Sequence, residues 1–306
     1  MPRPKSRYAA PVALILLTLI WSYNWIVMKQ VLRYVGPFDF AALRYVLGSG
    51  VLFIVLLARG DSLRPPPLVS TVLIGLAQTM GFQALVQWAL VDGGAGKTAL
   101  LAYTMPFWAV LLAWLLLAER PSRRQVIGLA VALGGLLLIL EPWQGFGGAR
   151  SAALAIAGGV CWGIGVVLSK RLFARGGTSA LSLTAWQMLA GTIGLIVIAF
   201  AADEPALQWS GYFIGALAYN AVLSSGLAWV MWSFVVDRLP TPIAGLSSLT
   251  VPICGVLLAW VLLGERPSSM ESCGIVLIAV ALLVVNLRRH AATPPAGGGE
   301  GTHHGS

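Results

Sequence analysis

Residues 110–122 read VLLAWLLLAERPS, and residues 256–268 read VLLAWVLLGERPS. Eleven of these thirteen positions are identical at a constant offset of 146 residues, and Pro106 pairs with Pro252 at the same offset. A weaker similarity joins residues 21–29 to the stretch that begins at Trp162. Two matching segments this far apart indicate that the chain consists of two related halves.

The composition identifies the environment of the chain. Of 306 residues, 58% are hydrophobic and only 10% are charged, and the mean hydropathy is +0.83. A water-soluble domain of this size has far more charged residues, so the sequence predicts an all-α protein that crosses a membrane several times. The net charge of +9 is scattered over short loops, so we expect no nucleic-acid partner.

Ten apolar stretches separate the charged clusters, and each approaches the ~20 residues that a membrane-spanning helix needs. The predicted spans are 8–28, 38–58, 68–91, 98–118, 125–140, 151–169, 180–201, 208–236, 241–263 and 271–287. Spans five and ten are the shortest, at about 16 residues each. The remaining segments are short loops and a tail over residues 291–306, which is rich in Gly and Pro and is expected to be disordered.

The positive charges predict the orientation. With both termini in the cytoplasm, fourteen Lys and Arg residues fall on the cytoplasmic side and five on the outer side. Residues 1–146 then form one five-helix repeat and residues 147–290 the second. Because five is odd, the second repeat enters the membrane from the opposite side, and the two repeats are inverted relative to each other.

Inverted repeats are typical of carriers, because the two halves can exchange conformations and expose a central site to each side in turn. The alternative is a membrane scaffold that transports nothing. The stripe of small residues Ala155, Gly159 and Gly163 suits close helix packing in such a scaffold, and it suits packing within one helix bundle equally well.

The repeated motifs resemble those of the drug/metabolite transporter superfamily. The resemblance is carried by the Glu-Arg-Pro triplets at residues 119–121 and 265–267, by Pro106 and Pro252, and by Trp-Ser-Tyr-Asn at 21–24. It covers nearly the whole chain as two EamA-type repeats. Within the superfamily the chain is most similar to the bacterial aromatic amino acid exporter. The resemblance implies a ten-helix carrier of the bacterial inner membrane that exports aromatic and other apolar amino acids or related metabolites.

Polar and aromatic side chains inside the spans are the candidates for a substrate site, because a polar group in lipid needs a partner and so faces inward. An aromatic amino acid needs apolar walls for its ring and a few polar groups for its charged ends. The predicted substrate-binding residues are Gln78, Phe82, Gln83, Tyr103, Trp162, Trp186, Asn220 and Ser248. Each of them could instead join packed helices.

Three further residues have predicted roles in shaping or gating the cavity. Pro106 and Pro252 fall near the middle of spans four and nine, where a proline removes a backbone hydrogen bond and can kink the helix or act as a hinge. Arg44 is the one charge well inside a span, and it could bind a carboxylate or form a gate. Alternatively, Arg44 extends toward the outer membrane surface, with Asp39 as its partner.

The missing residue types limit the mechanism. All acidic residues fall near span ends or in loops, which argues against a drug or organic-cation exporter, the alternative within transport. The His residues are all in the tail and the three Cys residues lack metal-ligand spacing, so we expect neither an enzyme nor a metal or cofactor site. Gly96-Lys97-Thr98 lacks the rest of a phosphate loop. The prediction is therefore a monomeric facilitator or exchanger that needs no ATPase subunit.

Overall fold

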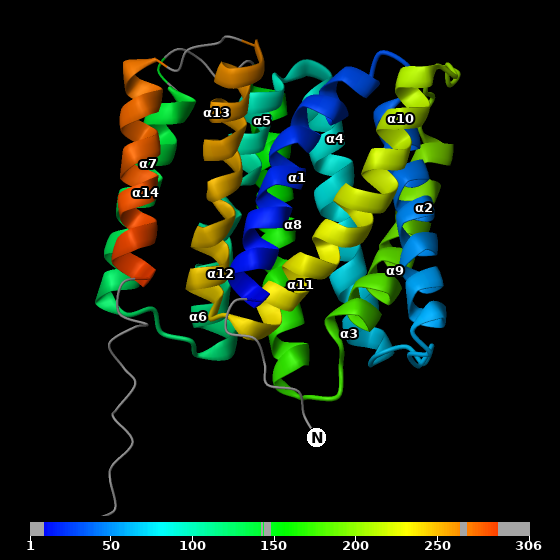
Figure 1. Cartoon of the computed structure of the whole chain (residues 1–306), viewed down its shortest axis with the longest axis horizontal. Coiled ribbons are helices and arrows are strands. Elements are labelled where there is room, and N and C mark those ends of the chain that lie inside the picture. The colour runs from blue at the N-terminus through cyan, green and yellow to red at the C-terminus, as the bar shows by residue number, and fades with distance from the viewer. Residues whose placement is uncertain (1–8, 142, 144–147, 264–267, 287–306) are drawn as a thin grey trace, which may run out of the picture.

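The computed structural model describes residues 9–141, 143, 148–263 and 268–286. Across those residues every long regular element is a helix, and the helices join into ten rods that stand side by side (Figure 1). The first five rods are α1 (Ala9–Val31), α2 (Pro37–Ala58), α3 (Leu68–Ile74) with η1 (Gly75–Gly81) and α4 (Phe82–Asp92), α5 (Ala95–Ala102) with α6 (Met105–Leu117), and α7 (Arg123–Leu140). The next five are α8 (Ala149–Ala174), α9 (Ala180–Ala201), α10 (Gly211–Tyr219) with η3 (Asn220–Leu227) and α11 (Ala228–Arg238), α12 (Thr241–Ser248) with α13 (Thr250–Leu263), and α14 (Ser269–Asn286).

The rods follow the predicted spans closely, and the all-helical prediction is confirmed. Seven rods in the described part of the chain are long and apolar enough to cross a membrane, and the shorter apolar helices 241–255 and 269–281 accompany them. Three helices are longer than the predicted spans. α7 and α14 each begin two residues before the predicted span, with polar residues in the first turn, so these helices have 18 residues each. The last turn of α8 extends to Ala174 because Lys170 and Arg171 continue the helix beyond the apolar stretch.

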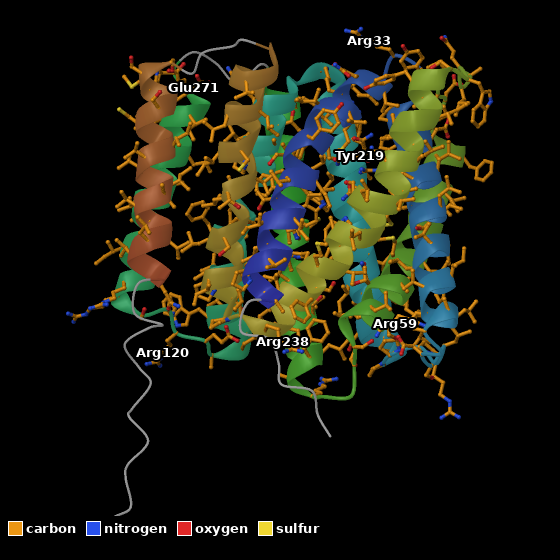
Figure 2. All side chains as sticks on the ribbon, viewed as in Figure 1. Arg33, Arg59, Arg120, Tyr219, Arg238 and Glu271 are labelled. Carbon is orange, nitrogen blue, oxygen red and sulfur yellow. The ribbon has the colours of Figure 1, made fainter. Side chains whose placement is uncertain are left out.

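The outer surface of the bundle is apolar. Large hydrophobic side chains point outward along the rods, and Phe200 is 86% exposed. Labelled charged side chains lie at the two ends of the bundle: Arg33 and Glu271 at one end, and Arg59 and Arg238 at the other (Figure 2). An apolar belt between two charged ends is the surface that a lipid bilayer solvates.

Two lysines bind the ends of helices at opposite ends of the bundle. Lys29, near the end of α1, donates to the carbonyl oxygen of Leu90 at the end of α4 (2.6 Å). Lys170, near the end of α8, donates to the carbonyl oxygens of Val236 (3.1 Å) and Leu239 (2.8 Å) at the end of α11. In both cases an ammonium group satisfies carbonyls that a helix terminus leaves free. Because α4 and α11 end at opposite ends of the bundle, α1 and α8 run in opposite directions (Figures 1 and 2).

Four rods are interrupted at corresponding places. The helix breaks at Tyr103, between α5 and α6, and again at Leu249, between α12 and α13. Each break lies three residues before a proline, Pro106 or Pro252, which has no N–H to continue the hydrogen-bond ladder. The other two interruptions are the π-helical segments η1 and η3, where the backbone is wider than in an α-helix. Such segments are common near functional sites.

Close packing of small residues holds rods together. Where α7 and α14 cross, a Cβ atom on Gly135 would lie 2.7 Å from the carbonyl oxygen of Gly274, so neither position has room for a side chain. The predicted stripe on α8 packs against α5 and α6 in the same way, because a Cβ on Gly159 would lie 2.9 Å from the carbonyl oxygen of Ala102. This stripe therefore packs within the bundle.

Candidate functional site

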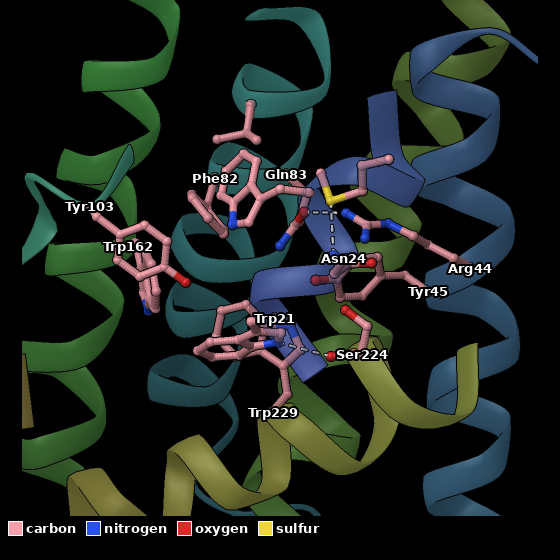
Figure 3. A pocket seen from close by; sticks show the side chains of 13 residues that line it. Trp21, Asn24, Arg44, Tyr45, Phe82, Gln83, Tyr103, Trp162, Ser224 and Trp229 are labelled. Carbon is pink, nitrogen blue, oxygen red and sulfur yellow. Dashed lines mark hydrogen bonds between the residues drawn. The ribbon is translucent and has the colours of Figure 1, made fainter. Parts of the chain in front are cut away.

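A small cavity lies in the middle of the bundle, and Figure 3 shows the thirteen residues that line it. They are Trp21, Asn24, Trp25 and Met28 of α1, Arg44 and Tyr45 of α2, Phe82, Gln83 and Val86 of α4, Tyr103 at the end of α5, Trp162 of α8, Ser224 of η3 and Trp229 of α11. The centre of a water molecule has only about 30 Å³ to occupy there, which is room for one or two waters. An amino acid could enter only if the surrounding rods moved apart.

One wall of the cavity is aromatic. The ring of Trp162 lies 5.6 Å from Trp21, 4.9 Å from Phe82, 5.4 Å from Tyr103 and 5.9 Å from Trp229, measured between centroids. Trp21 and Trp162 occupy corresponding positions on α1 and α8, so both halves contribute to this wall. Flat apolar surfaces of this kind suit a ring or a branched aliphatic group.

Arg44 forms the polar side of the cavity. Its side chain is only 1% exposed, and its Nη1 donates to the Oδ1 of Asn220 (2.9 Å). Its Nη2 donates to the Oε1 of Gln83, and its Nε has no hydrogen-bond partner. The guanidinium carbon lies 4.9 Å from the centre of the Tyr45 ring. Figure 3 shows Arg44 reaching across from α2 toward Gln83, on the side of the cavity opposite Trp162.

The prediction that Asp39 partners Arg44 is wrong. In the described part of the chain the ion pairs join other residues, and Arg44 points into the bundle and not toward the membrane surface. Glu204, in the loop after α9, accepts the backbone N–H of Phe38 (3.0 Å) and that of Asp39 (2.8 Å) at the start of α2. Burial raises the pKa of the Glu204 carboxyl. These bonds fix the first turn of α2 and so help to position Arg44.

The remaining polar groups of the cavity come from α1 and η3. Asn24 donates through Nδ2 to the Sδ of Met28 (2.9 Å), while its Oδ1 is buried without a hydrogen-bond partner. Trp21 donates through Nε1 to the carbonyl oxygen of Ser224 (3.2 Å). Asn24 therefore leaves one acceptor that faces the same small space as Arg44.

Four of the predicted substrate-binding residues line the cavity: Phe82, Gln83, Tyr103 and Trp162. The other four lie elsewhere. Asn220 lies behind Arg44 and holds it, and Gln78 packs against α8 at Gly165. Trp186 packs edge-on against Phe53 of α2, with 5.1 Å between ring centroids, and Ser248 donates to the carbonyl oxygen of Gly245 (2.7 Å).

The cavity also has lining residues outside the predicted substrate-binding set. Trp21, Asn24, Trp25 and Met28 lie at i, i+3, i+4 and i+7, so they form a single face of α1. The same spacing relates Val86 to Phe82. The helical periodicity around Trp21 was the signal that could have identified the α1 face.

The first of the two proline-associated breaks lies beside the cavity, and the second lies against α1. The first one places Tyr103 in the cavity wall, and a Cβ on Gly245 of α12 would lie 3.2 Å from the Cβ of Pro106. At the second break, Ser22 of α1 donates to the carbonyl oxygen of Val251 (2.9 Å). Side chain Oγ1 atoms of Thr18 and Thr250 are 2.9 Å apart in the same region. At the second break, a side chain of α1 therefore bonds to the backbone of the interrupted rod.

Only the first of the two Glu-Arg-Pro motifs can be placed. Glu119 accepts a hydrogen bond from the Oγ1 of Thr241, at the start of α12 (3.0 Å). This contact joins the first half to the second at the end of the bundle that carries Arg238. The second motif, at residues 265–267, lies outside the described residues, as do the tail from 291 and most of the N-terminal charges.

The family model that matches the chain and two of its relatives are described as transporters or efflux pumps. The model of the EamA-like transporter family matches residues 9–141 and 149–287. The chain is 26% identical over 283 residues to "Uncharacterized transporter YoaV" of Bacillus subtilis, covering 89% of this chain and 95% of that protein. It is 27% identical over 290 residues to "Probable amino-acid metabolite efflux pump" of Salmonella typhimurium, covering 88% and 92%. A solved crystal structure with 27% sequence identity superimposes with a TM-score of 0.77 and covers 94% of this chain and all of that one.

Proposed function

The chain belongs to the EamA-like transporter family, and from this premise we propose that it is a secondary carrier that exports apolar and aromatic amino acids or related metabolites. The relative in Salmonella typhimurium is named as a probable amino-acid metabolite efflux pump, which supports this substrate class. The proposed location is the bacterial inner membrane, with both termini in the cytoplasm and the protein acting as a monomer.

The main support for this proposal is the cavity, which has a polar side and an aromatic side. Arg44 and Asn24 lie on one side of it and Trp162 and Tyr103 on the other (Figure 3). An amino acid with an apolar side chain has the same division into a charged head and an uncharged body. The cavity is too small for an amino acid in this conformation and residues of both halves line it, so it has the position expected of a central site that two access states share.

Alternating access is the proposed mechanism. The two halves act as inverted repeats, and opening on either side requires the rods around the cavity to separate. The breaks beside Pro106 and Pro252 are the proposed hinges, because a helix without a continuous hydrogen-bond ladder bends at low cost. The Glu119–Thr241 contact would have to break when the cavity opens to the cytoplasm.

The charges of the cavity favour this substrate class over organic cations. Of the residues that the structure describes, those lining the cavity include Arg44 and no carboxylate. A buried cation repels a second cation, so a drug or organic-cation exporter would need a different site.

The test is counterflow in proteoliposomes that contain the purified protein. The vesicles are preloaded with unlabelled phenylalanine or tryptophan, and uptake of the labelled amino acid is followed without an ion gradient. Saturable accumulation above the level of empty liposomes is expected. No accumulation, either without a gradient or with an imposed pH step, would contradict the proposed function. The matched control is Trp186→Ala, which removes an indole outside the cavity and should leave accumulation intact.

A further inference from the structure

Arg44 is a buried charge whose neighbours in the protein do not neutralise it. Its two hydrogen-bond partners, Gln83 and Asn220, are amides that carry only partial charge. Among the described residues it forms no ion pair. A guanidinium stays protonated in proteins, and an isolated buried charge is costly unless an opposite charge joins it. The site therefore lacks an anion.

The guanidinium itself has unused hydrogen-bond donors for that anion. A guanidinium has five N–H donors in one plane. Two of them are used by the amides, and the Nε–H has no partner although it is buried. A carboxylate accepts two parallel bonds from such a fork, which gives a short and strong pair. Since Arg44 lines the cavity, a molecule that enters when the rods move apart would lie next to these donors.

The amine of an amino acid finds much weaker partners. The lining residues described here offer no carboxylate, and the free acceptor is the neutral Oδ1 of Asn24. The faces of Trp21 and Trp162 could add a cation–π contact, which is weaker than a charge pair. Arg44 itself opposes a second positive charge nearby.

We propose that the cavity recognises its substrate by the carboxylate, through Arg44, and not by the amine. This inference rests on the proposed transport function and narrows its substrate class to monocarboxylates with an apolar or aromatic body. Amino acids with such side chains belong to this class, and so do the corresponding acids without an amine. Amines and esters that lack the carboxylate do not.

The test compares four compounds with the same phenyl group: phenylalanine, 3-phenylpropionate, phenethylamine and phenylalanine methyl ester. Binding to purified protein in nanodiscs is measured by the change in tryptophan fluorescence, because four indoles line the cavity. The same compounds then compete with labelled phenylalanine in counterflow. We expect 3-phenylpropionate to bind within about tenfold of phenylalanine, and phenethylamine and the ester to bind at least about tenfold more weakly.

Variants of Arg44 test the assigned residue. Arg44→Gln should remove most of the preference for 3-phenylpropionate over phenethylamine, a change of about 10- to 100-fold. Arg44→Lys keeps the charge but loses the planar fork, so part of the preference should remain. Arg59→Gln is the matched control, since Arg59 is exposed and pairs with Asp61 outside the cavity, and it should leave the preference unchanged.

The outcomes separate this inference from the transport function. If phenethylamine binds as well as 3-phenylpropionate, or if folded Arg44→Gln keeps the wild-type preference, the inference is wrong even when transport occurs. If none of the compounds is transported, the proposed function fails and the binding order alone decides the inference. If the Arg44 variants do not fold, the order of the four compounds on the wild-type protein still decides it.

Discussion

Asn220→Asp places a carboxylate beside Arg44 without changing the size of the side chain. The Oδ1 of Asn220 is 2.9 Å from the Nη1 of Arg44, so the charge centres of the new pair would be about 4 Å apart. At an effective dielectric constant of about 20, their attraction is about 4 kcal/mol. Burying the carboxylate costs several kcal/mol, and the bond from Nδ2 to the carbonyl oxygen of Ala216 is lost. These terms nearly cancel, so we expect little change in the free energy of unfolding.

Asn220→Asp should affect transport much more than it affects the free energy of unfolding. The introduced carboxylate neutralises Arg44 and repels the carboxylate of the substrate, so the apparent affinity for phenylalanine should fall by about 10- to 100-fold. Asn220→Ala removes the acceptor but leaves the charge of Arg44 available. It should lower the free energy of unfolding by about 1.5–3 kcal/mol and weaken substrate binding less than Asn220→Asp does.

The assay measures the concentration dependence of phenylalanine counterflow together with thermal unfolding followed by tryptophan fluorescence. Gln125→Glu is the matched control, because it makes the same change from amide to acid in the capping box of α7, far from the cavity. It should alter neither quantity. If folded Asn220→Asp transports phenylalanine with the wild-type apparent constant, the assignment of the uncompensated charge to Arg44 is refuted.

Three further predictions concern the ends of the helices and the proline-associated breaks. Lys170→Met removes two hydrogen bonds to the end of α11 and should lower the free energy of unfolding by about 2 kcal/mol. The control is Arg171→Met, which changes an exposed neighbour and should alter the free energy of unfolding little. Thermal unfolding of the two variants compares them. Burial raises the pKa of Glu204, so the folded protein holds this proton to higher pH than the unfolded chain does. The protonated Glu204 carboxyl therefore contributes its full stability below the unfolded pKa and loses it as pH rises through the folded pKa. The free energy of unfolding of the wild type relative to Glu204→Gln should fall across that pH window. If this difference in free energy does not change with pH, the raised pKa of Glu204 is contradicted. Pro106→Ala and Pro252→Ala should lower the maximal transport rate and leave the apparent substrate constant unchanged, because continuous helices resist bending; equal rates would remove the hinge assignment.

Local features of the sequence predict the positions of the helices and reveal the duplication of the chain. Hydropathy and the positions of Gly, Pro and charged residues are local properties, so the predicted spans agree with the rods to within a few residues. The breaks beside Pro106 and Pro252 were also predictable, since a proline removes the same backbone hydrogen bond in any surrounding. The repeat of residues 110–122 at 256–268 needs no structure to be recognised.

Which faces of the helices meet depends on the packing of the whole bundle and could not be predicted from each helix alone. In a soluble protein the polar pattern of a helix shows which side is buried. Lipid is as apolar as the interior of a bundle, so largely apolar helices such as α2 and α9 carry less of this information. This is why Trp186 was expected in the cavity and lies against Phe53, and why Trp25 was not selected although it lines the wall. The Arg44 hydrogen bonds connect α2, α4 and η3, which are far apart in sequence, so the packing of the rods placed the charge in the cavity and left it without a counter-ion among its described neighbours.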